Sequence, residues 1–187
     1  PVAIIGAGVI GGGWTARFLL NGIDVKIHDP NPEAGRRLRE MIANAERAWD
    51  RLTSAPLPKK GSLSFCGTIQ EAVDGAVFIE ECIPENLELK RKILNEIETG
   101  AATDVPIGSS TSGIRPSEMQ SEMKHPERLL VTHPFNPVYL LPLVELCGGH
   151  LTDPEVIGKT SHFLESLGMR PLKQKKEIDG FLSDRLL

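Results

Sequence analysis

The sequence predicts an α/β fold with a doubly wound, mostly parallel sheet, and three observations support this. An apolar strand at residues 2–5 runs directly into the motif Gly6-x-Gly8-x-x-Gly11, which opens a helix. A second strand ends in Asp29, eighteen residues after Gly11. Strand-like and helix-like segments then alternate along the chain, as they do where helices connect parallel strands. Together these features predict a Rossmann-type domain.

Each glycine of the opening motif has its own predicted role. Gly6 permits the tight turn after the strand, Gly8 lets the backbone approach a pyrophosphate, and Gly11 lets the helix pack close to the sheet. The helix predicted at residues 9–21 begins with Val9 and Ile10, so its first N–H groups and positive dipole end point at the phosphates. We therefore expect a dinucleotide at this turn.

Asp29 indicates which dinucleotide binds. Its position is close to the spacing of about twenty residues expected for the acidic residue that binds the adenosine ribose. A carboxylate accepts hydrogen bonds from both ribose hydroxyls but repels the 2′-phosphate of NADP. The sequence therefore predicts NAD as the cofactor.

The other elements are predicted from periodicity and from the residues that break it. Strand 25–28 leads to a helix at 32–52 with Pro32 in its first turn, where proline is tolerated, and a loop rich in proline and glycine follows at 54–61. Further strands are expected at 63–66, 76–82, 105–109, 128–132, 143–146 and 170–173, and further helices at 69–73, 87–99 and 154–167.

Composition narrows the function classes. The 187 residues carry a net charge of −4, which argues against nucleic acid or an anionic membrane surface as partner. The sequence has no apolar run long enough to span a membrane and no secretory leader, so we expect a cytoplasmic protein. Three widely spaced cysteines, Cys66, Cys82 and Cys147, are interpreted as buried thiols of a reducing compartment, and no metal site is predicted.

A base for alcohol oxidation is sought where the predicted strands end, because open parallel sheets bind ligands at that edge. Among the five histidines, His133 follows the strand at 128–132 and opens a loop bounded by prolines. An unperturbed imidazole titrates at a pKa of about 6.5, which suits proton transfer near neutral pH. Glu145 interrupts the apolar strand at 143–146, where a carboxylate needs a partner. Either Glu145 faces an imidazolium at His133, or it points outward from an edge strand.

The order of the motifs identifies a family. The chain resembles the 3-hydroxyacyl-CoA dehydrogenase family along nearly its whole length. The matching segments are the glycine motif, Pro84-Glu-Asn-Leu-Glu-Leu-Lys90, Ser109-Ser-Thr-Ser112, His133-Pro-Phe-Asn-Pro137, Leu143-Val-Glu145 and Asp179-Gly-Phe-Leu-Ser-Asp-Arg185. This resemblance implies an NAD-binding domain at 1–178 and, from 179–187, the beginning of a helical second domain that forms a homodimer. Because the sequence starts at Pro1 and stops within this last motif, we expect the natural polypeptide to be longer.

The resemblance also implies roles for single residues. The catalytic His and Glu of the family fall on His133 and Glu145, and its active-site serine falls on Ser112, which binds either the substrate oxygen or the nicotinamide ribose. The cofactor contacts of the family correspond to Glu85 and Lys90 in this sequence. Asn136, in the motif of His133, is expected to position the nicotinamide or the substrate.

One departure from the family bears on the substrate. The family has an asparagine before the last arginine of the final motif, whereas this chain has Asp184. A carboxylate at that place favours a cationic substrate over an acyl thioester. Other segments resemble the carnitine-oxidising branch of the superfamily, which implies carnitine, or another 3-hydroxy acid, as the small-molecule substrate. The alternatives are a 3-hydroxyacyl-CoA such as 3-hydroxybutyryl-CoA and, in a different class, an NAD-binding module without catalytic activity.

Overall fold

The computed structural model describes residues 1–54 and 56–182. Its centre is an eight-stranded sheet of order β3-β2-β1-β4-β5-β6-β7-β8, in which the β6–β7 pair is antiparallel and every other pair is parallel. The strands are β1 (Val2–Ile5), β2 (Val25–His28), β3 (Leu63–Phe65), β4 (Phe78–Glu81), β5 (Ile107–Ser109), β6 (Leu129–Pro134), β7 (Leu143–Gly148) and β8 (Arg170–Lys173). The predicted doubly wound, mostly parallel sheet is confirmed.

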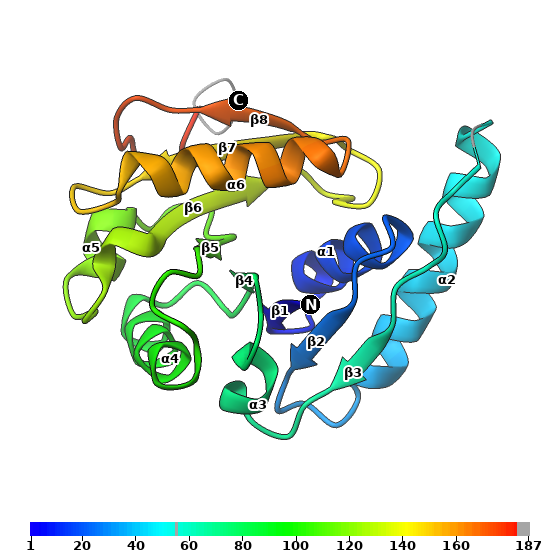
Figure 1. Cartoon of the computed structure of the whole chain (residues 1–187), viewed down its shortest axis with the longest axis horizontal. Coiled ribbons are helices and arrows are strands. Elements are labelled where there is room, and N and C mark those ends of the chain that lie inside the picture. Colours follow the sequence, from blue (N-terminus) through cyan, green and yellow to red (C-terminus); the bar gives the residue numbers. More distant parts are fainter. Residues whose placement is uncertain (55, 183–187) are drawn as a thin grey trace.

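Helices cover both faces of this sheet (Figure 1). One hydrophobic core joins the sheet to α1 (Val9–Leu20), α2 (Ala34–Leu52) and α6 (Pro154–Ser166). A second core joins it to α3 (Ile69–Val73), α4 (Leu87–Gly100) and α5 (Pro116–Gln120). Successive residues of a strand point to opposite faces, so neighbours in sequence enter different cores. Among the described residues, no helix is long and apolar enough to cross a membrane.

Several boundaries differ from the sequence prediction. Helix α2 begins at Ala34, not at 32, because a turn precedes it: the N–H of Ala34 donates to the carbonyl oxygen of Asn31, and the N–H of Glu33 donates to the Asn31 side chain. Helix α5 and the 3₁₀ turn Pro126–Arg128 were not expected. Cys147 is buried, but Cys66 and Cys82 are only half-buried, because each follows the last residue of its strand.

The most consequential difference concerns β6. This strand continues through His133 to Pro134, so the histidine belongs to the sheet and not to the following loop. The extension arises because the antiparallel pairing with β7 persists to this end, where His133 lies directly opposite Glu145. Residues paired in this way point to the same face of a sheet. The fold therefore places the two side chains side by side.

Candidate cofactor site and active site

The glycine turn between β1 and α1 has the geometry of a phosphate cradle. Gly6 adopts φ of +100°, and a Cβ there would lie 2.7 Å from the carbonyl oxygen of Cys82. A Cβ on Gly11 would lie 1.9 Å from the carbonyl oxygen of Gly6, so the helix approaches the strand as closely as backbone permits. Gly8 faces open space, and no side chain caps the helix that follows it. The first N–H groups of α1 are therefore available to an anion.

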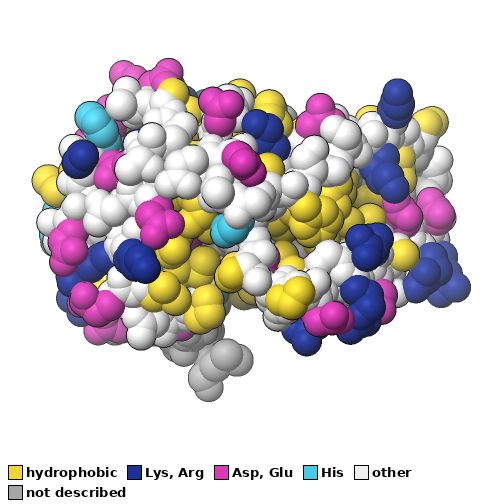
Figure 2. All heavy atoms as spheres, turned by 90° about the horizontal axis from the view of Figure 1, so that it is seen from below, with side chains coloured by type: hydrophobic (Ala, Val, Ile, Leu, Met, Phe, Trp, Pro, Cys, Tyr) yellow, Lys and Arg dark blue, Asp and Glu magenta, His cyan; other side chains and the backbone are white. Residues whose placement is uncertain are grey.

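A cavity of about 690 Å³ lies over this turn. Five residues predicted to bind the cofactor line it: Gly6, Gly8, Val9, Ile10 and Asp29. Its opposite wall is mainly apolar and is supplied by Ile69, Ile83, Leu89 and Ile93, from and around α3 and α4. Figure 2 views the side of the molecule that carries these helices, and hydrophobic side chains gather near the middle of it. The cavity thus combines a phosphate cradle with an apolar wall suited to a flat base.

Asp29 connects the end of β2 to the glycine turn. Its Oδ2 accepts a hydrogen bond of 2.7 Å from the backbone N–H of Ala7, and its Oδ1 accepts one of 2.7 Å from the N–H of Asn31. These bonds hold the carboxylate at the mouth of the cavity. Its remaining lone pairs are suitable acceptors for ribose hydroxyls.

His133 and Glu145 form a hydrogen-bonded pair at the other end of the sheet edge. Nδ1 of His133 lies 2.8 Å from Oε2 of Glu145, whose side chain is 1% exposed. Oε1 of the same carboxylate accepts hydrogen bonds from the side chain of Gln174 at 3.2 Å and from the backbone of Leu182 at 3.0 Å. Glu145 is therefore fixed on both oxygens. Within the part of the chain that the structure describes, Nε2 of His133 has no hydrogen-bond partner and is the nitrogen available to a ligand.

Two aromatic rings enclose the imidazole of His133. The ring centroid of Phe135 lies 5.8 Å from that of His133, and the centroid of Phe181 lies 5.3 Å away on a different segment. The His133 side chain is 13% exposed. These rings limit contact with solvent while leaving the imidazole reachable.

Glu85 organises the loop that carries Ser112. Its Oε1 accepts hydrogen bonds from the hydroxyl of Thr111 at 2.5 Å and from the backbone N–H groups of Ser112 at 3.1 Å and Gly113 at 2.9 Å. Burial alone would raise the pKa of Glu85, but these bonds and the charge of Lys90 outweigh it, so its pKa is lowered. The carboxylate is accordingly ionised at neutral pH, and the structure brings Glu85 and Ser112 together.

Lys90 lies behind Glu85 and is buried. Its Nζ donates to both carboxylate oxygens of Glu81, at 2.7 and 3.0 Å, and to the carbonyl oxygen of Ile83 at 3.2 Å. Its nearest approach to Glu85 is 3.7 Å. The ammonium thus contacts protein oxygens with all three of its N–H donors. Neither Lys90 nor Glu85 lines the cavity over the glycine turn, whereas Ile83, whose carbonyl oxygen accepts from Lys90, does.

Glu80 and Glu81 are buried site residues that the sequence prediction did not assign. Glu81 also accepts a hydrogen bond of 2.5 Å from Ser109 and one of 2.7 Å from the backbone of Ile83. A signal was present in the sequence, because two adjacent carboxylates inside a predicted buried strand must each have partners. Their partners belong to other elements and were not visible in the pattern.

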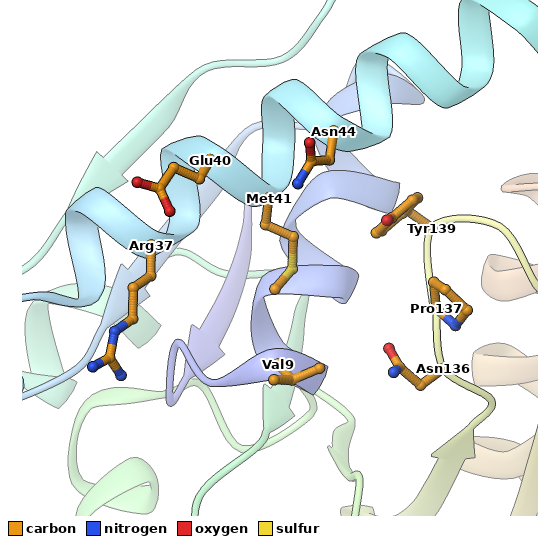
Figure 3. Close-up of a pocket in the computed structure, with 8 residues that line it drawn as sticks. All are labelled: Val9, Arg37, Glu40, Met41, Asn44, Asn136, Pro137 and Tyr139. Atoms are coloured by element: carbon orange, nitrogen blue, oxygen red, sulfur yellow. The ribbon is translucent and has the colours of Figure 1, made fainter.

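Asn136 lines a separate pocket of about 330 Å³ between α2 and the β6–β7 loop (Figure 3). Val9 borders both this pocket and the larger cavity, so the two adjoin at the start of α1. In Figure 3 the side chain of Met41 points from α2 towards Val9, while Asn136 and Tyr139 lie on the facing side. Asp184, the remaining predicted site residue, lies outside the described residues. No cluster able to hold a metal ion occurs within 1–54 and 56–182.

The protein-family model that describes the NAD-binding domain of 3-hydroxyacyl-CoA dehydrogenase matches residues 1–178 of this chain. The chain belongs to this family. The predicted family and the predicted cofactor NAD are both confirmed by this match, and the cradle, the apolar wall and Asp29 described above fit that cofactor.

Curated members of the 3-hydroxyacyl-CoA dehydrogenase family are similar over the entire chain. The protein named L-carnitine dehydrogenase/betainyl-CoA thioesterase from Rhizobium meliloti (strain 1021) is 57% identical over 99% of this chain, which corresponds to 37% of that protein. The L-carnitine dehydrogenase of Oceanobacillus iheyensis is 50% identical over 100% of this chain and 61% of its own length. The chain therefore spans only part of each of these relatives.

Solved structures of the family share the fold. The NAD⁺-dependent dismutase FHMPC 5-dehydrogenase superposes with a TM-score of 0.92 at 33% identity, over 99% of this chain and 60% of that one. The 3-hydroxybutyryl-CoA dehydrogenase of Escherichia coli gives a TM-score of 0.82 at 26% identity, over 92% of this chain and 37% of that one.

Proposed function

We propose that the protein oxidises the 3-hydroxyl of L-carnitine to 3-dehydrocarnitine with NAD, using His133 and Glu145 as a general-base pair. The observation that carries this proposal is the contact of 2.8 Å between His133 Nδ1 and Glu145 Oε2, at the same sheet edge as the NAD cradle. The substrate assignment is supported by relatives named L-carnitine dehydrogenase that are at least 50% identical to this chain.

The pair performs the proton transfer of this oxidation. NAD, when bound, accepts the hydride from the carbon that bears the hydroxyl group. Nε2 of His133 takes the hydroxyl proton at the same time, so that the alcohol becomes a ketone. Glu145 accepts the hydrogen bond of Nδ1–H, which fixes the tautomer, and its charge stabilises the imidazolium that forms. In the reverse direction the same nitrogen returns the proton.

The remaining predicted residues position the reactants in this scheme. Glu85 holds the backbone of Ser112, whose hydroxyl then binds the substrate oxygen or the nicotinamide ribose. Lys90 fixes Glu81 and Glu85 and acts through them. Asn136 reaches the site from the neighbouring pocket, which Val9 connects to the NAD cavity.

The second candidate substrate is a 3-hydroxyacyl-CoA, because the matching family model bears that name and the E. coli structure is a 3-hydroxybutyryl-CoA dehydrogenase. The proton chemistry would be identical. Asp184 favours the cationic substrate, since a carboxylate attracts the quaternary ammonium of carnitine and repels the phosphates of CoA.

A substrate panel tests the proposal. L-Carnitine, D-carnitine and 3-hydroxybutyryl-CoA are each incubated with the intact protein and NAD or NADP, and reduced cofactor is followed by absorbance. The proposal predicts turnover with L-carnitine and NAD. Turnover with 3-hydroxybutyryl-CoA alone would establish the second candidate. Calorimetric binding of NAD without turnover of any substrate would indicate a non-catalytic NAD-binding module.

The proposal extends to location and assembly. Cytoplasmic residence is supported by three free cysteines, and a homodimer formed through a helical second domain is supported by the family resemblance. Size-exclusion chromatography with light scattering measures the assembly directly. A monomeric mass for the intact protein would contradict the homodimer.

A further inference from the structure

Glu80 is a buried carboxyl group that the proposed mechanism does not use. It lies on β4 next to Glu81, and both residues are 0% exposed. Because neighbouring residues of a strand point to opposite faces, the two side chains enter different surroundings. Glu81 meets Lys90 from α4. Glu80 points to the other face of the sheet, beneath α1.

Two hydroxyl groups donate hydrogen bonds to Glu80, and a residue of α1 contacts one of these hydroxyls. The hydroxyl of Ser110, just after β5, donates to Oε1 at 2.5 Å, and the hydroxyl of Thr132 on β6 lies 2.7 and 2.8 Å from the two oxygens. Nε1 of Trp14 on α1 donates to the Ser110 hydroxyl at 2.9 Å. The carboxyl group thus connects the end of β5 with the end of β6.

Gly108 makes this connection possible. Strand β5 runs between β4 and β6, so the Glu80 side chain must cross it to reach Thr132. A Cβ at Gly108 would lie 2.4 Å from Oε2 of Glu80 and 2.5 Å from Oγ1 of Thr132. Any larger residue at position 108 would therefore displace the Glu80 carboxyl group from Thr132.

Among residues 1–54 and 56–182, no cationic side chain forms an ion pair with Glu80. Burial raises the pKa of Glu80 to about 8, although the hydrogen bonds from Ser110 and Thr132 act in the opposite direction. Of the charged groups nearby, Glu81 raises this pKa and Lys90 lowers it, while burial and Glu80 itself raise the pKa of the Cys82 thiol. The hydroxyls of Ser110 and Thr132 supply the direct hydrogen bonds of Glu80, and the indole of Trp14 donates to the Ser110 hydroxyl. At neutral pH the group is mainly a neutral acid, able to donate one hydrogen bond as well as accept others.

We propose that Glu80 is a positioning residue that ties the end of β5 to the end of β6 and thereby sets the spacing between Ser112 and His133. Ser112 lies two residues beyond Ser110, and His133 directly follows Thr132. A shift of the Glu80 carboxyl group relative to Ser110 and Thr132 is therefore expected to move both residues. The inference rests on the proposed function of His133 and Ser112. A glutamine of equal shape retains a carbonyl acceptor and an N–H donor, whereas leucine retains neither.

The test compares Glu80→Gln with Glu80→Leu in the intact protein, with Phe78→Leu as a control in the same strand and core. The readouts are the imidazole NMR signals of His133, the Kd for NAD, and kcat and KM with L-carnitine. We expect Glu80→Leu to displace the His133 signals and to lower kcat at least tenfold, with KM within about threefold. In Glu80→Gln both the His133 signals and kcat should stay close to their wild-type values. Phe78→Leu should destabilise the fold without moving the His133 signals.

Two results would overturn the inference. One is unchanged His133 signals in Glu80→Leu despite a lowered Tm, which would make Glu80 a purely structural residue. The other is a Glu80→Gln variant that behaves like Glu80→Leu. The NMR readout requires no substrate, so it decides the role of Glu80 even if the wild-type protein fails to oxidise carnitine.

Discussion

The two halves of the ligand-binding sheet edge are built in different ways. The cofactor half, around β1 and β2, depends mainly on backbone, namely three glycines and an uncapped helix start. One side chain, the carboxylate of Asp29, adds to it. The reactive half, around β4 to β7, depends on side chains that hydrogen-bond between different elements, such as His133 with Glu145 and Glu81 with Lys90. The difference predicts that changes in the first half alter NAD affinity, whereas changes in the second half alter turnover or stability.

The largest expected effect comes from the buried ion pair of the reactive half. Lys90→Met leaves the Glu81 carboxylate buried without its cation, which should lower the free energy of unfolding by about 3–5 kcal/mol. Urea denaturation measures the loss, and Lys92→Met, an exposed lysine of the same helix, is the matched control. A Lys90→Met variant as stable as its control would show that the pair does not hold this half together.

Glu80 offers a pH-dependent test of the same half. Its folded-state pKa of about 8 lies above the value of about 4.3 for an unfolded chain. The stability that its protonation contributes is complete below the unfolded value and is lost as pH rises through the folded one, by up to about 1.4 kcal/mol per pH unit. In urea titrations the free energy of unfolding of the wild type should therefore fall between pH 6 and pH 8. Glu80→Gln, which has no carboxyl group at this position, should not show this loss, so the difference in its favour should grow with pH. If the free energy of unfolding changed with pH in the same way in both proteins, Glu80 could not be a neutral acid in the folded state.

Asp29 tests the cofactor half. Asp29→Ala removes the acceptor for the ribose hydroxyls, and the loss of a hydrogen bond to a charged group costs about 1.5–3 kcal/mol. The Kd for NAD in calorimetry should therefore rise about 10- to 100-fold. Asp24→Ala, at the other end of β2, is the control and should bind like wild type. An unaltered Kd in Asp29→Ala would remove this residue from the site.

The smallest expected effect is that of Ser112→Ala. One neutral hydrogen bond is worth about 0.5–1.5 kcal/mol, so kcat/KM should fall about 2- to 10-fold. Comparison of KM for substrate with Kd for NAD then shows whether the hydroxyl binds the substrate oxygen or the ribose. Activity equal to wild type would exclude both roles.

The same contrast explains what the sequence reveals. Gly6, Gly8, Gly11 and Asp29 were predictable because their spacing alone encodes a turn, a close approach and a strand end. The pairing of His133 with Glu145 was anticipated, but the continuation of β6 through His133 depends on the register with β7, which only the folded sheet displays. The partners of Glu80 are 30 and 52 residues away in sequence, so no local pattern contains them.

The start of α2 illustrates the same limit on a small scale. Pro32 is acceptable in the first turn of a helix, and sequence reasoning placed the helix start there. The structure instead uses the side chain of Asn31 to form a turn, and the helix begins two residues later. Two hydrogen bonds to Asn31, from the N–H groups of Glu33 and Ala34, close this turn, and the sequence pattern alone does not reveal them.

Single-turnover hydride transfer in His133→Gln tests the central claim most directly. With NAD and L-carnitine at saturation, the loss of the general base should slow the appearance of NADH by about 10²- to 10⁴-fold, while the Kd for NAD stays within about twofold of wild type. A rate within about twofold of wild type would contradict the claim that His133 takes the proton.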